Sequence, residues 1–332
     1  MDYMLVARSK SGDGFSNEPG AVYFLGVPSS EDSPKFRHKM PPRAWCNAIL
    51  EKASSGTQNT QTTGDIVFYV HGYNNSQETV LKRQRKLQRG LERNGFDGVL
   101  VSFDWPSANN ALNYLEDWHD VKKSALVLVK HGIHAFAKIQ DPKCKIDMHV
   151  IAHSMGAYVV REAFDDADDT ADIAQKSWSV SQVMLVGGDV SVSSLAADNP
   201  KSSSLYRHCA RLTNYHNPFD NALSVSAVKR IGVAPRAGRR GLEPPYHDKV
   251  ANVHCGDYYE NRHTDESFNH GHVWYFDDPH FLQDVYLTIC GEIDRASIST
   301  RRKMGMGDWP CEPNLFFGWN GIITASAPGI TS

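Results

Sequence analysis

The sequence has few of the features that mark disulfide-rich, membrane-spanning or nucleic-acid-binding proteins. Its 332 residues contain six cysteines, and no two of them stand at the C-x-x-C spacing of zinc or redox sites. No apolar run is long enough to span a bilayer, and Met4–Ala7 soon meets charged residues, unlike an export signal. The formal net charge is only −3, which gives no global attraction for nucleic acid. These absences predict a cytoplasmic globular protein, and they indicate nothing about its oligomeric state.

The chain divides by pattern into a loose beginning, a regular middle and a loose end. Residues 1–64 hold two apolar runs, Tyr3–Ala7 and Ala21–Val27, and Gly/Ser-rich sequence. We expect edge strands and a flexible connection there. Residues 65–300 are the expected catalytic domain, and residues 301–332 are expected to be a tail or flap of that same domain.

From residue 65 onward, strand-like and helix-like segments alternate. This alternation predicts an α/β protein with a mostly parallel central sheet and helices on both faces. The expected strands are Ile66–Val70, Val99–Phe103, Ile146–Ala152, Val183–Val186, Ala210–Tyr215 and Val250–His254, and the expected helices are Gln77–Arg93, a stretch within Leu112–Ile139 and a helix from Met155.

The helix expected from Gln77 has the most detailed local pattern. Asn75 with Glu78 is an approximate capping box, and Gly95 stands where the helix would stop. Helical spacing relates Val80, Gln84, Leu87 and Leu91.

A serine stands on a sharp turn between the apolar strand Ile146–Ala152 and the helix that follows. Such a turn needs small residues two before and two after the serine, because it is strained and the helix packs tightly against the strand. Ala152 and Gly156 supply them. This context predicts that Ser154 is a nucleophile.

A serine nucleophile needs a histidine to take its proton and a carboxylate to orient that histidine. Two acids follow expected strands, Asp189 and Asp220, and the loop Phe268–Tyr275 is the expected source of the histidine. The polar turn around Asp220 can swing a carboxylate toward a histidine, whereas Asp189 could equally cap a following turn. We therefore favour Asp220.

The developing oxyanion also needs two amide donors. One is the N–H of Met155, the residue after the nucleophile. The second is expected in the loop after an earlier strand, where His71-Gly72 ends Ile66–Val70 and Tyr73 can donate its N–H.

Together these segments resemble the α/β-hydrolase superfamily, and specifically its bacterial group of largely uncharacterised serine esterase-like proteins. The resemblance spans roughly residues 65–290 and departs from the usual pattern at Ala152, which is commonly glycine. It implies Asp220 as the acid, since an Ala-Leu pair follows it, and His272 as the base, since it follows glycine in the late loop. The motifs are His71-Gly72-Tyr73-Asn74, Phe103-Asp104-Trp105-Pro106-Ser107, Ala152-His153-Ser154-Met155-Gly156, Asp220-Asn221-Ala222-Leu223 and Gly271-His272.

The resulting prediction is hydrolysis of a small-molecule carboxylic ester through an acyl-enzyme, with no cofactor and no metal. Trp105, Tyr158 and Trp274 are expected to contact the substrate. The basic cluster of the Gly/Pro loop is expected to be a solvated rim, although a rim arginine near a pocket could select acidic substrates. It comprises Arg230, Arg236, Arg239 and Arg240.

Two alternatives stay open. A late histidine cluster could chelate zinc or iron and make the protein a metal-dependent hydrolase, although the serine turn would then have no purpose. The fold could also serve as a non-catalytic binding module. The cluster consists of His263, His270, His272 and His280.

Overall fold

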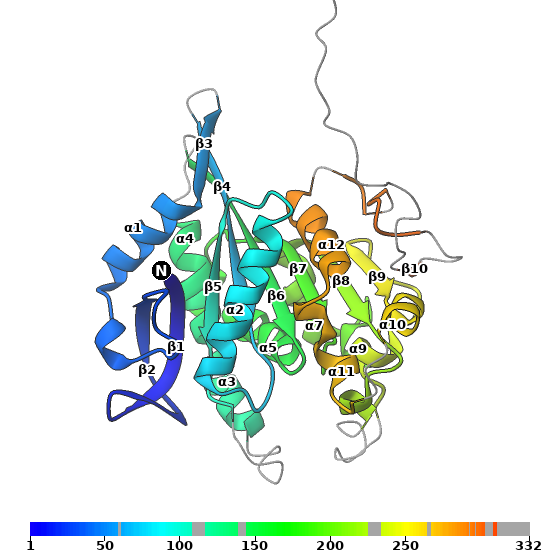
Figure 1. Ribbon diagram of the computed structural model, residues 1–332, viewed down its shortest axis with the longest axis horizontal. Coiled ribbons are helices and arrows are strands. Elements are labelled where there is room, and N and C mark those ends of the chain that lie inside the picture. Colours follow the sequence, from blue (N-terminus) through cyan, green and yellow to red (C-terminus); the bar gives the residue numbers. More distant parts are fainter. Residues whose placement is uncertain are drawn as a thin grey trace, which may run out of the picture.

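A computed structural model describes residues 1–58, 61–107, 117–138, 144–224, 234–263, 267–291, 293–295, 297–302 and 308–310. Within them one ten-stranded sheet has the order β10-β9-β8-β7-β6-β4-β5-β1-β2, with β3 paired to β4 (Figure 1). Only β2 and β3 pair antiparallel to their neighbours. The strands are β1 (Asp2–Ser11), β2 (Gly14–Val27), β3 (Ser54–Gln58), β4 (Gln61–Val70), β5 (Val99–Asp104), β6 (Cys144–His153), β7 (Val180–Val186), β8 (Cys209–His216), β9 (Val250–His254) and β10 (Asp308–Pro310).

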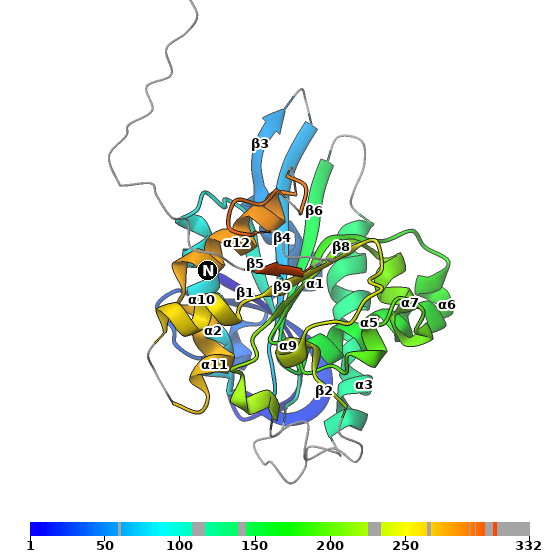
Figure 2. The same ribbon diagram turned by 90° about the vertical axis from the view of Figure 1, so that its right-hand side faces the viewer.

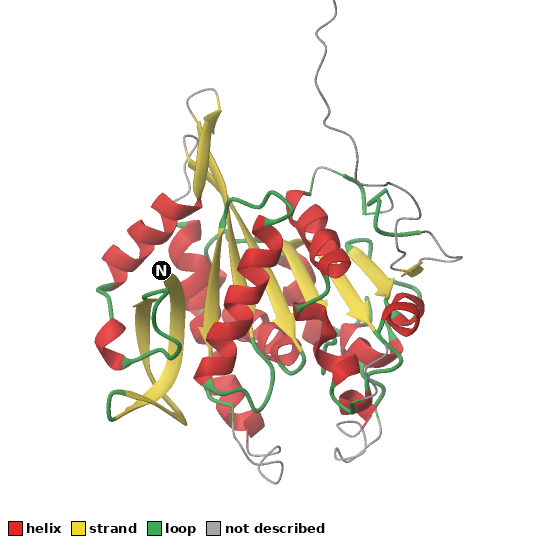
Figure 3. Cartoon of the chain, in the orientation of Figure 1, coloured by secondary structure: helices red, strands yellow, loops and turns green. Residues whose placement is uncertain are grey.

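Helices cover both faces of the sheet, which confirms the predicted α/β class (Figures 2 and 3). One face packs against α2 (Gln77–Glu92), α10 (Gly256–Arg262), α11 (His270–Val273) and α12 (Pro279–Cys290). The other packs against α1 (Pro42–Ala53), α3 (Asp117–Val127), α4 (His134–Ala137), α5 (Gly156–Asp169), α6 (Ala171–Ala174), α7 (Pro200–Arg207) and α9 (Ala237–Arg240).

The central strand β4 shows how the sheet divides the core. Successive side chains of a strand point to opposite faces. Accordingly Ile66, Phe68 and Val70 belong to one buried cluster, while Val67 and Tyr69 belong to the other. All five are 0% exposed. A strand covered on both faces carries apolar residues without alternation, which is the pattern seen in the sequence.

The predicted helix after β4 is confirmed, but its predicted cap is wrong. The spaced residues Val80, Gln84, Leu87 and Leu91 are all buried. Ser76, one residue after the predicted Asn75, is the N-cap, and its hydroxyl accepts a hydrogen bond from the N–H of Thr79 at 3.2 Å. The Asn75 side chain instead bonds to the preceding turn.

The N-terminal residues are joined to the main sheet. β1 lies between β2 and β5, so β2 is the edge strand of this hairpin. Helix α1, which the sequence analysis does not predict, buries Trp45 and Ile49 in the core. In the stretch expected to be helical within Leu112–Ile139, α3 and α4 are joined by a π-helical segment, Leu128–Ile133, while residues 112–116 and 139 lie outside the described part. Across the described residues, no helix combines the length and apolarity needed to cross a bilayer.

Candidate active site

The turn that carries Ser154 joins β6 at the centre of the sheet to α5. Its backbone is strained, because Ser154 has a φ of +57°, in the left-handed region that side chains other than glycine rarely adopt. Two hydrogen bonds hold this conformation: the N–H of Ser154 donates to the carbonyl of Val186 at 3.1 Å, and the carbonyl of Ser154 accepts from the N–H of Asp189 at 2.8 Å. The expected strand, sharp turn and helix are therefore present.

Close backbone contacts explain the glycines around this turn. A Cβ atom on Gly156 would lie 2.4 Å from the carbonyl oxygen of Val70. A Cβ atom on Gly72 would lie 2.7 Å from the Cβ atom of Ser154 and 3.2 Å from its hydroxyl oxygen. The loop after β4 therefore lies directly against the serine.

The structure brings His272 and Asp220 together. Nδ1 of His272, in α11, lies 2.6 Å from Oδ2 of Asp220, whose side chain is 0% exposed. The other carboxylate oxygen of Asp220 accepts the N–H of Leu223 at 3.0 Å. Asn217 donates to the carbonyl of Gly271 at 3.0 Å and so ties the two loops together.

The residue before the serine links this pair to the turn. The ring of His153 lies 4.7 Å from the ring of His272, centroid to centroid, and its Nε2 donates to the carbonyl of His272 at 2.8 Å. Burial, and after it the nearby His272, lowers the pKa of His153 well below its ordinary value, so His153 stays neutral. Among the described contacts, Ser154 has no hydrogen bond to His272. Such bonds commonly tighten only when substrate binds.

The second candidate acid has another partner. Oδ1 of Asp189 lies 3.3 Å from Nε of Arg236, and both side chains are buried. The expectation of a solvated rim is therefore wrong for Arg236, because the carboxylate draws it into the protein. Arg239 donates to the carbonyl of Asp220 at 2.6 Å, whereas Arg230 lies outside the described residues.

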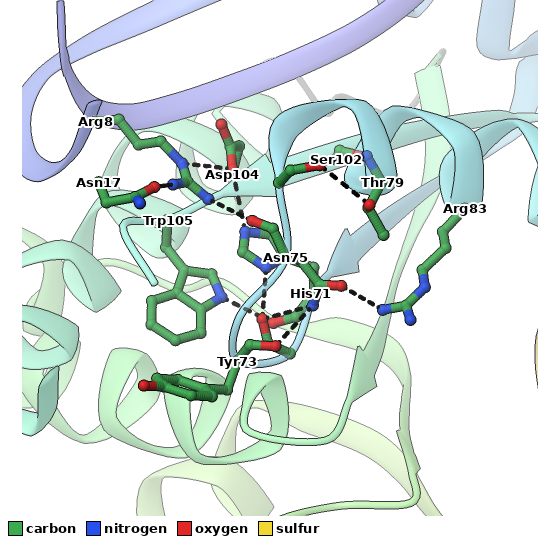
Figure 4. A network of polar contacts seen from close by, with 12 residues as sticks. Arg8, Asn17, His71, Tyr73, Asn75, Thr79, Arg83, Ser102, Asp104 and Trp105 are labelled. Carbon is green, nitrogen blue, oxygen red and sulfur yellow. Dashed lines mark hydrogen bonds and ion pairs between the residues drawn. The ribbon is translucent and has the colours of Figure 1, made fainter. Parts of the chain in front are cut away.

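A buried polar network lies behind the loop that faces the serine (Figure 4). Oδ1 of Asp104 accepts from Nε of Arg8 at 2.8 Å and lies 3.1 Å from Nε2 of His71. Burial raises the pKa of Asp104, but the Arg8 guanidinium and the His71 contact outweigh it and hold the pKa below its ordinary value. Burial lowers the pKa of His71, so the ion pair of the network is Arg8 with Asp104.

The network fixes the carbonyl groups of the loop. The indole of Trp105 donates to the carbonyl of His71 at 2.8 Å. Asn75 donates to the carbonyls of Gly72 at 2.8 Å and Tyr73 at 3.2 Å, and Arg8 donates to the carbonyl of Asn75 at 3.3 Å. A carbonyl and the N–H of the same peptide point in opposite directions. Because the Gly72 carbonyl points to Asn75, the N–H of Tyr73 points away from the network.

The sequence pattern did not indicate a role for Arg8, and Asp104 stood out only as part of the motif Phe103–Ser107. One signal was available. Asp104 directly follows the run Val99–Phe103, whose apolar and hydroxylated residues predict a buried strand, and the structure shows Asp104 to be 0% exposed. A buried carboxylate requires a partner, so its position indicated an unidentified cation.

All three aromatic residues expected to contact substrate are buried, and Tyr158 is 2% exposed. Trp105 is 0% exposed and stacks on His71 with ring centroids 5.3 Å apart. Trp274 is 2% exposed and packs against Tyr258. Neither offers a substrate an accessible surface, whereas Tyr158 lines a cavity.

The rings of His263 and His270 lie 5.2 Å apart, centroid to centroid, but the late histidines have different polar or stacking partners. His263 lies 3.1 Å from Asp278, His270 lies 2.9 Å from the hydroxyl of Tyr259, and His280 stacks on Tyr258. Within the described residues, no group of three or more histidine, cysteine, aspartate or glutamate side chains is arranged to hold a metal ion.

Comparisons with known proteins identify the family. Residues 50–273 match the family model described as alpha/beta hydrolase of unknown function (DUF900). No curated protein matches the chain. Among solved structures, the phospholipase PlaB from Legionella pneumophila, in complex with thio-NAD, is 16% identical over 38% of this chain and 25% of its own, with a TM-score of 0.24. Because the family model covers most of the chain, and the parallel sheet and serine turn agree with it, the protein belongs to this α/β-hydrolase family.

Proposed function

We propose that the protein is a serine hydrolase that cleaves carboxylic esters through an acyl-enzyme. The observation that carries this proposal is the contact of 2.6 Å between Nδ1 of His272 and Oδ2 of Asp220. His153, the residue before Ser154, donates to the carbonyl of His272 and so ties this pair to the strained serine turn. A histidine paired with a buried carboxylate is suited to take and return a proton.

In the proposed reaction, Oγ of Ser154 attacks the ester carbonyl while Nε2 of His272 takes the hydroxyl proton. Asp220 keeps the ring oriented through Nδ1 and stabilises the imidazolium that forms. The N–H groups of Tyr73 and Met155 donate to the oxyanion. Met155 is the N-cap of α5, and the amides at the N-terminal end of a helix have no partner within the helix. His272 returns its proton to the leaving alcohol, and water then releases the acid by the same steps.

The test measures hydrolysis of p-nitrophenyl esters over a series of acyl lengths, with the corresponding thioesters and anilides as further arms. Ser154→Ala is expected to lower kcat by on the order of 10³-fold or more, because only binding and oxyanion contacts remain. Ser181→Ala is the matched control, since Ser181 is the second residue of the neighbouring strand β7 and its hydroxyl bonds to Asp147. A Ser154→Ala protein that keeps the wild-type rate contradicts the proposal.

A further inference from the structure

A cavity of about 210 Å³ lies on the flank of the serine turn. Three cationic side chains, three serines and one tyrosine contribute to it, and among the described residues that line it there is no carboxylate. The lining consists of Tyr158, Arg161, Ser191, Ser193, Ser194, Asn199, Lys201 and Arg236.

Two connections place this cavity next to Ser154. One runs through α5, because Tyr158 lies in the first turn of this helix, four residues after Ser154 along the chain. On the other side, Asp189 donates its N–H to the carbonyl of Ser154 at 2.8 Å and its carboxylate pairs with Arg236 at 3.3 Å. Ser191 forms an isolated β-bridge with the same arginine.

Arg161 is built into the wall of the cavity. It is 6% exposed, its guanidinium lies 4.8 Å from the ring centroid of Tyr158, and its Nε atom is buried without a hydrogen-bond partner among the described residues. One terminal nitrogen contacts Glu162, whose other oxygen lies 3.3 Å from Lys122. The carboxylate beside Arg161 is thus shared with a second cation.

Lys201 is the third cationic residue of the lining. It is exposed and stands in the first turn of α7, where its N–H donates to the side chain of the N-cap Asn199 at 3.0 Å. The N-terminal end of a helix favours negative charge. Arg161 and Arg236 each contact one carboxylate, Glu162 and Asp189, and Asp165 also lies near enough to Arg161 to interact with it. Lys201 has no ion pair among the described residues, so its charge is the one at this cavity that no carboxylate contact offsets.

We propose that this cavity binds an anionic oxygen group of the substrate, a carboxylate or a phosphate, while the ester carbonyl lies at Ser154. The inference rests on the proposed function and adds a substrate class to it. Arginine donors suit such groups, because the guanidinium offers several N–H groups in one plane, and the serine hydroxyl groups can satisfy the remaining oxygens.

The experiment compares matched esters that differ only in charge. Mono-p-nitrophenyl succinate is paired with p-nitrophenyl butyrate, and 1-butyryl-glycerol 3-phosphate with 1-butyrylglycerol, so the arms distinguish a carboxylate from a phosphate. Wild-type protein is expected to prefer one anionic ester by about 10- to 100-fold in kcat/KM, as one charge-assisted hydrogen bond allows. Lys201→Met and Arg161→Gln should each lower this ratio toward one. The matched control Lys52→Met, an exposed lysine of α1, should keep it.

The outcomes separate this inference from the proposed function. If the neutral esters are cleaved in a Ser154-dependent manner and both ratios stay near one, the anionic site is wrong and the hydrolase stands. If no ester is cleaved, the cavity is judged by binding of inorganic phosphate at constant ionic strength. Phosphate should then raise the melting temperature of wild type and Lys52→Met but not of Lys201→Met, and an unchanged wild-type melting temperature overturns the inference.

Discussion

Replacing Asp104 by asparagine tests whether the buried network positions the loop that faces the serine. The carboxylate is 0% exposed, Arg8 lies 2.8 Å away with 1% of its side chain exposed, and His71 lies 3.1 Å away. Asparagine keeps the volume and removes the charge. The Arg8 guanidinium is then left buried without its counter-ion.

The expected loss of folding stability follows from the burial of this ion pair. Breaking a buried ion pair by removing one partner destabilises a protein by about 3–5 kcal/mol. Catalysis should suffer as well, because the contacts of Arg8, Asn75 and Trp105 determine where the loop carbonyls point. Complete loss of an oxyanion donor costs about 10²–10³-fold in kcat, so a misaligned Tyr73 N–H should cost about 10- to 100-fold with a smaller change in KM.

Urea denaturation between pH 3 and pH 7 measures the contribution of the Asp104 ion pair to the free energy of unfolding. Because the folded pKa of Asp104 is lowered, its contribution is complete above the unfolded pKa of about 3.9 and is lost as the pH falls through the folded value. The difference in unfolding free energy between wild type and Asp104→Asn should therefore shrink toward the acid end. Steady-state kinetics at pH 7 supply kcat and KM.

Asp65→Asn is the matched control. Asp65 also lies in the sheet and contacts a histidine, His149, at 2.9 Å, but it is partly exposed, stands five residues before the end of β4 and does not touch the loop. It should leave kcat unchanged and cost less stability. A folded Asp104→Asn protein with wild-type kcat, or one within about 0.5 kcal/mol of wild-type stability, refutes the positioning role.

Three further predictions concern the proposed catalytic site. Asp220→Asn should lower kcat by roughly 10²–10⁴-fold, whereas Asp189→Asn should cost mainly stability by weakening its ion pair; the reverse pattern would transfer the role of acid to Asp189. His272→Ala should abolish turnover while EDTA leaves the wild-type rate intact, and bound zinc with loss of activity on chelation would favour the metal alternative. Gly72→Ala places a methyl group 2.7 Å from the Cβ of Ser154, so kcat should fall at least 10-fold, and an unchanged kcat would mean that this loop does not constrain the serine.

The sequence predicted the elements whose local pattern agrees with their tertiary setting. The apolar strand before Ser154 and the helix Gln77–Glu92 are examples. Helix α1 was missed because its sequence starts with two prolines and contains only a few core residues before the Gly/Ser-rich stretch begins. The apolar spacing that indicates a helix is therefore short. The predicted N-cap was one residue away from the observed one, Ser76. Asn75 and Ser76 are both good N-cap residues, but the side chain of Asn75 is engaged by the preceding loop.

Contacts between distant parts of the chain could not be predicted in this way. Arg8 directly follows the apolar run Tyr3–Ala7, and its partner Asp104 lies 96 residues away along the chain. Arg236 has the sequence context of a surface loop, yet the carboxylate of Asp189 holds it in the interior. Trp105 and Trp274 carry no local sign of whether they face a pocket or the core. Each of these outcomes depends on which strands become neighbours.

The most direct test of the central claim is the site of covalent labelling by a fluorophosphonate, located by mass spectrometry of the digested protein. The proposed chemistry predicts one stoichiometric adduct on Ser154, whose formation is lost in Ser154→Ala and strongly slowed in His272→Ala because the serine is no longer activated. An adduct on another serine, or no adduct on folded wild-type protein that hydrolyses esters, would contradict the assignment of Ser154 as the nucleophile.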